Sequence, residues 1–440
     1  MDNGLSRRSL LKIGAGCGAA AVLTPLGASG ALAAPPEGKG GRLIPAGKVG
    51  TITFTQRDVP GRLAISAGGT TMGFLGGPDF LADPNANPTD LGPLVPLPGG
   101  WKELFEYLSG AGFTQIEFAG YGQNAANPGG TASYSATPEG RAAYLAYAGR
   151  LRGLLDDNGL EAIGNHGFIP NTWNGPGSAG GAMSESDLLR FQTELEFGAI
   201  LGTPYLGTGS DPTSANNRNI EPWTLAGEKW TALNELSVNQ FGIHMYPHNH
   251  DPAYAFLQDG PLVEVTVSRQ SGLPLAAPQV VRGESGKRLM QHWLDITPAD
   301  LVKAELDIYW AHVAQHIHRW RYDWEGNRVE DIFDPLAQVQ VQTQRYPLYH
   351  AKDGDSTGQA PGAGASLGTG TQGSAQGYTM IPFGDPRSDI DFATFFKEQG
   401  ARGNHNPNYE QDNAPGGGSD PGRSLRSSYQ SAFNMNALRG

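Results

Sequence analysis

Runs of alternating apolar and polar residues recur along this chain, and stretches with helical spacing of apolar residues separate most of them. Alternation with a period of two predicts a β-strand, and apolar residues at every third or fourth position predict an amphipathic helix. The segments with strand patterns are 49–56, 114–119, 161–164, 204–208, 241–245, 306–309, 347–351 and 404–411. The segments with helical patterns are 101–111, 137–158, 184–201, 222–240, 334–341, 390–399 and 424–438.

Helix-start and helix-stop residues flank several of the helical segments. Thr137 precedes Pro138 at the start of one segment, and proline is favoured in the first turn of a helix. Ser184 opens another segment, with a carboxylate three residues later in the manner of a capping box. Gly112 and Gly202 follow the last helical residues of two segments, as C-terminal caps do.

The order of these elements predicts an α/β fold, a parallel (β/α)8 TIM barrel with long loop insertions. A doubly wound open sheet is the alternative, but no glycine-rich phosphate loop follows the first predicted strand. Three stretches without a strand–helix rhythm, near 60–97, 258–297 and 354–380, are expected as insertions. The second insertion contains a predicted hairpin arm at 262–268. Residues 48–440 are expected to form a single barrel.

The first 34 residues are expected to be a twin-arginine signal peptide. Residues 6–12 read SRRSLLK, a weakly apolar stretch follows, and residues 31–33 offer a small-residue cleavage site. Glycine, threonine and proline make this stretch too polar for stable membrane insertion. We therefore expect the twin-arginine export machinery as a partner, an extracellular, periplasmic or cell-envelope location, and a flexible tether at 35–47. The single cysteine, Cys17, lies in this leader, so the exported chain is expected to have no disulfide.

The charge of the chain limits its partners. The formal net charge is −12 at pH 7, and the expected leader is itself basic, so the exported part is more acidic still. An acidic surface repels the phosphate backbone, and nucleic acid is therefore not an expected partner.

Imidazole and carboxylate side chains stand at the ends of the last four predicted strands. His248 and His250 follow the fifth strand, and Asp307, His350 and Glu410 lie on the sixth, seventh and eighth. The C-terminal ends of barrel strands share one face, so these side chains are expected to meet there. A mixed nitrogen and oxygen set of this kind suits one divalent metal ion, Mn²⁺, Zn²⁺ or Mg²⁺. Any one of these residues alone would equally fit a structural hydrogen bond, and it is their order that singles out the set.

Six segments together resemble the sugar phosphate isomerase/epimerase superfamily, whose members have a xylose-isomerase-like barrel. The segments are 49–58, GLEAIGNHG, FGIHMYPHNHD, ELDIYWAHVA, YHAKD and NYEQD. The resemblance covers nearly all of the expected mature chain outside the three insertions. It implies a divalent metal held on strands five to eight, and Asp307, His350 and Glu410 match that ligand pattern residue by residue. On strand five the chain departs from it, because Tyr246 stands where many epimerases have the ligating glutamate.

This departure leaves the fourth ligand open. The candidates are His248, His250 and, if the second insertion folds back, Glu264. We take His250 as the expected ligand and His248 as a catalytic group, although the sequence does not decide which of the two points inward.

The resemblance implies an isomerase or epimerase that acts on a sugar or keto-sugar by proton abstraction next to a carbonyl. Glu410 is the expected base, and His248 and Lys352 are the expected acids. The small-molecule partner is then a carbohydrate. Two alternatives stay open: a metal-dependent lyase or dehydratase that carries out β-elimination on a 3-keto-glycoside, and a non-catalytic carbohydrate-binding barrel.

Further side chains are expected to contact the substrate. They are His166, Trp173, Asn249 and Glu117. His166 fits a structural histidine equally well, and Trp173 either stacks on a sugar ring or packs in the core. Glu117 lies inside a predicted strand and also fits an ion pair on the floor of the barrel. His312 and His316 share a helical face and are expected to be solvated.

Overall fold

The structure is a computed structural model, and it describes residues 43–75, 94–127, 133–178, 181–356 and 379–438. These residues belong to one compact unit, which spans 34–440. The signal peptide expected at 1–34 lies outside the described residues, as do most of the expected tether, the middle of the first insertion and most of the third. No helix in the described ranges combines the length and the apolar character that crossing a bilayer requires.

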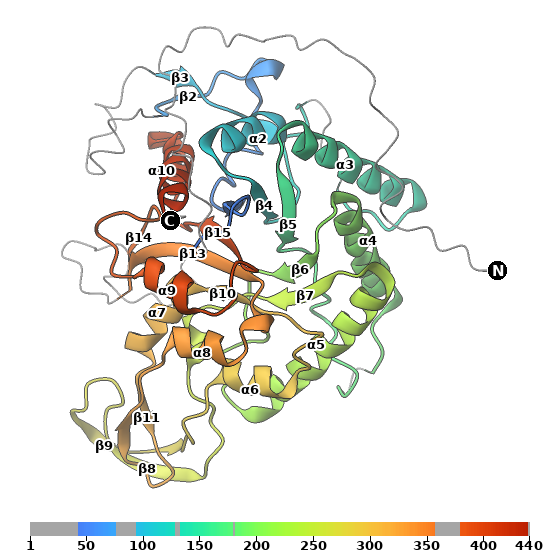
Figure 1. Cartoon of the computed structure of the whole chain (residues 1–440). Coiled ribbons are helices and arrows are strands. Elements are labelled where there is room, and N and C mark those ends of the chain that lie inside the picture. The colour runs from blue at the N-terminus through green and yellow to red at the C-terminus, as the bar shows by residue number, and fades with distance from the viewer. Residues whose placement is uncertain (1–42, 76–93, 128–132, 179–180, 357–378, 439–440) are drawn as a thin grey trace. The chain divides into compact units, whose positions relative to one another are not determined.

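Eight parallel strands in the described residues form the centre of the fold (Figure 1). They are β1 (Gly50–Ile52), β4 (Gln115–Phe118), β5 (Glu161–Asn165), β6 (Tyr205–Thr208), β7 (His244–Pro247), β10 (Glu305–Asp307), β13 (Leu348–Asp355) and β15 (Asn406–Glu410). One sheet has the order β10-β13-β15-β1-β4-β5, and β6 pairs with β7. A parallel bridge between His166 and Gly207 joins β5 to β6.

The remaining junction lies between β7 and β10. The backbone N–H of Lys303, just before β10, donates to the carbonyl of Met245 in β7 at 3.2 Å. Each of the eight strands therefore lies beside its neighbours in chain order, and β15 returns to pair with β1. The predicted (β/α)8 barrel is confirmed, and the open-sheet alternative is wrong.

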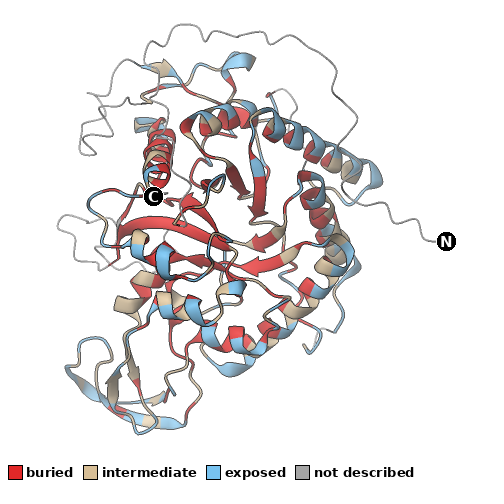
Figure 2. Cartoon of the chain, viewed as in Figure 1, coloured by how far each residue is buried: buried red, intermediate tan, exposed pale blue. Residues whose placement is uncertain are grey.

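Helices follow most of the strands and turn their buried faces toward the barrel (Figure 2). They are α2 (Gly100–Ala111), α3 (Pro138–Asp157), α4 (Glu185–Leu201), α5 (Ile220–Phe241), α6 (Leu289–Ile296), α7 (Ile308–Ile317), α8 (Pro335–Val341), α9 (Phe392–Glu398) and α10 (Arg423–Ala437). The side chains of Thr137 and Ser184 accept hydrogen bonds from backbone N–H groups in the first turns of α3 and α4, which are the predicted caps. Gly202 ends α4 in the left-handed conformation, with φ 77°.

Three strand boundaries differ from the predicted ones. Phe241 is the last residue of α5, and Gly242 caps that helix with φ 68°, so β7 begins only after the glycine. Asp307 ends β10 because its side chain accepts a hydrogen bond from the N–H of Trp310 and thereby starts α7. The first strand is shorter than expected, since the chain turns after Ile52.

Short antiparallel pairs lie in the insertions and in the segment between α7 and α8. The predicted arm in the second insertion is β8 (Leu262–Val267), which pairs with β9 (Pro274–Arg282). The other short strands are β2 (Met72–Gly73), β3 (Val95–Pro96), β11 (Trp320–Tyr322), β12 (Arg328–Glu330) and β14 (Thr379–Ile381). These elements lie outside the ring of eight parallel strands.

Polar side chains occupy the middle of the barrel. Glu117, Glu305, His350 and Asn408 have no exposed surface although each lies on a barrel strand. Burying such groups is costly unless each finds a partner, so their contacts with one another decide whether this barrel is stable.

His405, just before β15, holds the N-terminal end of the described chain. Its Nε2 lies 2.7 Å from the carbonyl of Leu43, and its Nδ1 lies 3.0 Å from Gln399 Nε2, so Nδ1 accepts and the neutral ring fits both bonds. Burial lowers the pKa of His405 to about 4. In the unfolded chain the pKa is about 6.5, so the unfolded state binds the proton first as the pH falls.

We expect acid to destabilise the fold through this residue. The stability contributed by neutral His405 is fully present above about pH 6.5 and is lost as the pH falls toward 4, by about 3 kcal/mol in total. Denaturant unfolding at pH 7 and pH 4.5 should therefore show a smaller loss of unfolding free energy for His405→Gln than for the wild type. Equal losses in the two proteins would contradict this role.

Candidate metal centre

Strand alternation builds the site in two layers. Residues two apart on a strand face the same side, and three strands supply such pairs: Glu305 and Asp307 on β10, His350 and Lys352 on β13, and Asn408 and Glu410 on β15. The register sets Asp307 opposite His350 and Lys352 opposite Glu410. The first member of each pair lies deeper in the barrel, and the second lies toward the carboxyl ends of the strands.

The outer layer centres on Lys352. Its Nζ lies 2.8 Å from Asp307 Oδ2, 2.9 Å from Glu410 Oε2 and 2.9 Å from Asp412 Oδ1. His350 reaches this layer from below, with Nδ1 2.6 Å from Glu410 Oε2. Three carboxylates thus surround one buried ammonium.

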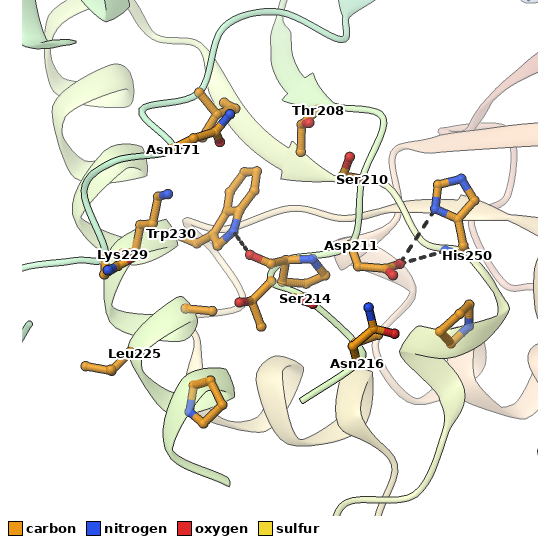
Figure 3. A pocket seen from close by; sticks show the side chains of 18 residues that line it. Asn171, Thr208, Ser210, Asp211, Ser214, Asn216, Leu225, Lys229, Trp230 and His250 are labelled. Carbon is orange, nitrogen blue, oxygen red and sulfur yellow. Dashed lines mark hydrogen bonds and ion pairs between the residues drawn. The ribbon is translucent and has the colours of Figure 1, made fainter. Parts of the chain in front are cut away.

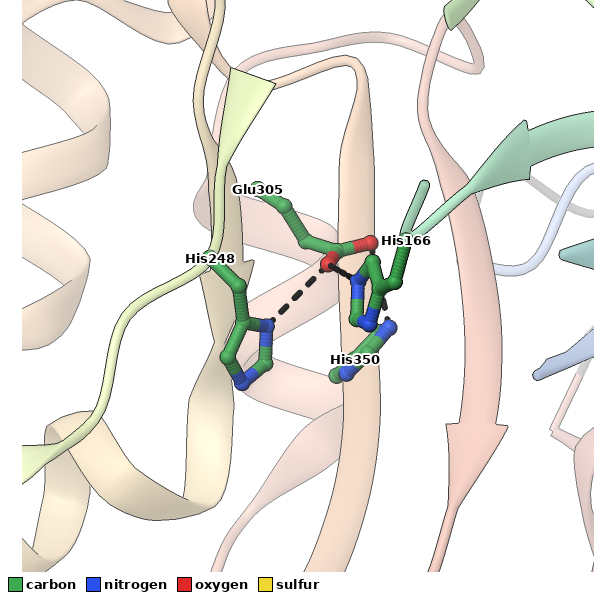
Figure 4. A group of neighbouring side chains, drawn as sticks. All are labelled: His166, His248, Glu305 and His350. Carbon is green, nitrogen blue, oxygen red and sulfur yellow. Dashed lines mark hydrogen bonds and ion pairs between the residues drawn. The ribbon is translucent and has the colours of Figure 1, made fainter. Parts of the chain in front are cut away.

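The inner layer centres on Glu305, with three histidines around its carboxylate (Figure 4). Glu305 Oε2 lies 2.9 Å from His166 Nε2 and 3.1 Å from His248 Nδ1, and Oε1 lies 3.1 Å from His350 Nε2. Glu117 Oε2 contacts the same nitrogen of His350 at 3.0 Å. Each ring therefore has a carboxylate partner within the barrel.

Glu117 itself is held from two sides. The hydroxyl of Tyr246 donates to its Oε1, and Asn408 Nδ2 donates to its Oε2 at 2.9 Å. Tyr246, which occupies the position where the resemblance led us to look for a glutamate, is thus part of the support beneath the histidines.

Side chains from both layers together can hold a metal ion. His248, Asp307, His350 and Glu410 each offer one ligand atom, and these atoms all lie within 4.8 Å of one another. The four residues come from neighbouring strands and are 0–4 % exposed. Despite the short distances above, Asp307 Oδ2, His350 Nδ1 and Glu410 Oε2 make no hydrogen bond of regular geometry within the described chain. Convergent nitrogen and oxygen atoms of this kind fit a divalent cation, which would compete with the Lys352 ammonium for Asp307 Oδ2 and Glu410 Oε2.

The charges of this centre stabilise one another. Burial alone would raise the pKa of Glu410, but Lys352 and His350 hold it well below the ordinary value. Burial alone would lower the pKa of Lys352, but Asp307, Asp412 and Glu410 hold it well above the ordinary value. Burial raises the pKa of Asp412 to about 6. Glu410 is therefore ionised beside a charged ammonium.

The two carboxyls of the inner layer differ from each other. Burial, together with the neighbouring Glu305, raises the pKa of Glu117. Burial also opposes ionisation of Glu305, yet His350, His166 and His248 hold its pKa well below the ordinary value. Glu305 is thus the negative charge that the three imidazoles share.

His248 and His250, the two histidines that follow β7, lie in different environments. His248 joins the ligand group, with Nε2 3.4 Å from Asp307 Oδ2. His250, which we expected as the ligand, lies outside that group: its backbone N–H donates to Asp211 Oδ1 at 2.7 Å, and its ring centroid is 4.8 Å from that of His248. Burial lowers the pKa of His250 well below the ordinary value.

The other predicted residues are divided between the centre and the framework. His166 and Glu117 lie in the inner layer. Asn249 is fully buried and pairs with the backbone of Asp307, accepting from its N–H at 2.9 Å and donating to its carbonyl at 3.3 Å. Trp173 is buried at a distance from this cluster, and its indole N–H donates to the carbonyl of Gly181. Glu264 is exposed on β8.

Glu305 was missed in the sequence, although it makes three contacts in the centre. The signal was present in the spacing, because Glu305 stands two residues before Asp307, immediately before the predicted strand at 306–309. Asp412, two residues after Glu410, could have been found by the same rule.

No protein-family model matches the chain, and no curated protein matches it either. Among solved structures, a sugar phosphate isomerase/epimerase from Parabacteroides distasonis ATCC 8503 is 16% identical with a TM-score of 0.48, over 89% of this chain and 94% of that chain. The probable 3-DHS dehydratase AsbF from Bacillus anthracis is 12% identical with a TM-score of 0.44, over 87% and 97%. The 3-keto-D-glucoside 4-epimerase YcjR from E. coli is 13% identical with a TM-score of 0.38, over 76% and 93%. Similarity at this level extends no further than the fold.

Removal of single ligands tests the assignment of the centre. We expect Asp307→Ala, His350→Ala, Glu410→Ala and His248→Ala each to lower the affinity for Mn²⁺ or Zn²⁺ by tenfold or more, because each removes one of four convergent atoms. His250→Ala and His316→Ala should leave it within about twofold. Metal content after dialysis and titration calorimetry measure both groups. Loss of metal in His250→Ala and not in His248→Ala would reverse the assignment of these two residues.

Glu305 is expected to act through the histidines that it holds. Glu305→Gln keeps the shape but removes the charge that orients His248 and His350, so metal affinity should fall by roughly 10–100-fold. The absorption spectrum of the Co²⁺-loaded protein should shift as well, which a merely structural loss would not cause. Glu264→Gln, exposed on β8, is the matched control. An unchanged spectrum and affinity in Glu305→Gln would contradict the role.

Proposed function

We propose that the protein is a divalent-metal-dependent isomerase or epimerase that acts on a sugar or keto-sugar by removing a proton from a carbon next to a carbonyl. The observation that carries the proposal is the convergence of His248, Asp307, His350 and Glu410 beside the charged Lys352. This set combines a place for a cation with an ionised carboxylate and a proton donor. Proton transfer at a carbon next to a carbonyl needs those three parts.

The metal ion would be held by the four ligand residues. Two imidazoles and two carboxylates suit Mn²⁺ or Zn²⁺, and Mg²⁺ less well, since Mg²⁺ prefers oxygen ligands. When bound, the ion supplies a Lewis acid that polarises the carbonyl oxygen of the substrate.

Glu410 is the base in this proposal. Contacts with Lys352 and His350 keep its carboxylate ionised, and it is 4% exposed at the carboxyl end of β15, where barrel enzymes place catalytic groups. It takes the proton from the substrate carbon and, in an isomerisation, returns it to the neighbouring carbon.

Lys352 is the proton donor that remains once His248 serves as a ligand. Its Nζ lies 2.9 Å from Glu410 Oε2, so acid and base stand side by side. This adjacency also favours a second candidate, a lyase that eliminates a β-substituent from a keto-sugar, because Lys352 can then protonate the departing oxygen.

The substrate is proposed to be an unphosphorylated carbohydrate. The signal peptide expected at 1–34 favours a site of action outside the cytoplasm, in the envelope or beyond, where sugars and glycosides are commoner than sugar phosphates. The acidic net charge also disfavours phosphorylated ligands.

Solvent exchange tests the reaction. Metal-loaded protein incubated in D₂O with ketoses and with 3-keto-glycosides should place deuterium at the carbon next to the carbonyl. Glu410→Gln, compared per bound metal ion, should slow this exchange by roughly 10²–10⁴-fold, because the base is removed. Mass spectrometry and NMR of the recovered sugar give the site and the extent of labelling.

The reaction products distinguish the isomerase or epimerase from the lyase. A labelled isomer or epimer supports the first proposal, and an unsaturated product supports the lyase. Glu264→Gln should exchange as fast as the wild type. An absence of exchange with every sugar in fully metal-loaded protein would overturn both and favour a binding protein.

A further inference from the structure

A large polar cavity lies beside the candidate metal centre (Figure 3). Its volume is about 630 Å³, and its walls come from the segments that follow β5 and β6 and from helix α5. Sites for small molecules occupy about 300–1,000 Å³, so the cavity has the size of a ligand site. It opens where the segments that follow barrel strands gather, the usual place of substrate sites in this fold.

Neutral hydroxyl and amide groups dominate the lining. Those that face the cavity include Asn171, Thr208, Ser210, Ser214 and Asn216. None of these five side chains hydrogen-bonds to another residue of the described chain, so their donors and acceptors are available to a ligand. A sugar ring presents several hydroxyls, each of which both donates and accepts, and such a ligand is matched by hydroxyl and amide partners.

The charged groups of the lining leave the cavity close to neutral. Asp211 stands at one end, tied to the backbone of His250, and Lys229 stands at the other, as Figure 3 shows. Burial raises the pKa of Asp211 to about 7 and lowers the pKa of Lys229, so burial disfavours the charged form of each group. An uncharged ligand therefore suits the cavity better than an anion.

His250 separates the cavity from the candidate metal centre, and none of the four proposed ligand residues lines the cavity. His250 belongs to its wall, and the ring of His250 lies 4.8 Å from that of the proposed ligand His248. The carbonyl of Thr208, another wall residue, accepts from the N–H of His248 at 3.0 Å. A ligand in the cavity would be one side chain away from the reacting groups.

A second cavity, of about 520 Å³, meets the centre through His166 and shares Asn171 and Thr208 with the first. Together the two spaces exceed what one sugar ring needs. The two cavities thus offer room for more than one sugar unit beside the centre.

We propose that the larger cavity is a second sugar-binding subsite, so that the substrate is a disaccharide or glycoside whose reacting ring sits at the centre while its other ring occupies the cavity. This inference rests on the proposed function for the identity of the reacting ring. The subsite itself is defined by the hydroxyl and amide lining and by the contact through His250.

Binding measurements test the subsite without turnover. Glucose, maltose, cellobiose and trehalose are titrated into Mn²⁺-loaded full-length protein by calorimetry, with tryptophan fluorescence as a second readout because Trp230 lines the cavity. At least one disaccharide should bind ten times more tightly than glucose. Asn216→Trp and Ser214→Trp, at exposed positions of the wall, should bring the disaccharide to within about threefold of glucose and leave glucose unchanged.

Asn239→Trp, on the exposed side of α5, is the matched control and should keep the preference. Binding no tighter than threefold over glucose for every disaccharide, or a preference that survives both cavity variants, would overturn the subsite. A cavity-dependent preference without deuterium exchange would refute the proposed reaction and keep the subsite. Equal deuterium exchange of free and glycosylated keto-sugars, unaffected by Asn216→Trp, would refute the subsite and keep the proposed reaction.

Discussion

The contacts of His350 are the interaction on which the rest of this barrel depends. Its ring has no exposed surface, and its two nitrogens reach opposite ways, Nε2 to Glu117 and Glu305 below and Nδ1 to Glu410 above. Ionisable groups can be buried at the centre of a barrel only if each is balanced by a partner, since an isolated buried charge costs several kcal/mol. His350 is the residue through which the two layers balance each other.

Neighbouring side chains stabilise the buried charges around His350. Tyr246 and Asn408 donate to Glu117, so that its carboxyl is bonded from beneath while the histidine approaches from the side. The ammonium of Lys352 offsets part of the negative charge of the three outer carboxylates. Ile163 and Leu348 pack against Tyr246, so a small apolar cluster of strand residues adjoins this polar centre.

The periodic patterns predicted the eight strands because barrel strands and their helices bury regular faces. The ends of the strands were harder to predict, since a single residue can set each end. Asp307 caps α7 and so ends β10, and Gly242 ends α5 inside the segment that was predicted as a strand. Asp307, His350 and Glu410 could be placed at one face by strand order alone. The choice between His248 and His250 could not, because the strand stops at Pro247 and the alternation that would orient them stops with it. The spacing of Glu305 from Asp307 was visible in the sequence. Its contacts with three histidines were not, because they join residues that are far apart in the chain.

Asn249 occupies the seam between β7 and β10, where the strand ladder has no regular pairing. Its amide presents the same donor and acceptor as a peptide group, and it takes both backbone groups of Asp307 as a neighbouring strand would. The Asn249 side chain therefore supplies the hydrogen bonds that a neighbouring strand would make, and it does so at Asp307, a residue of the candidate metal centre. The contact between β7 and β10 and the position of Asp307 therefore depend on the same side chain. A substitution of Asn249 would disturb both the barrel wall and the candidate metal centre.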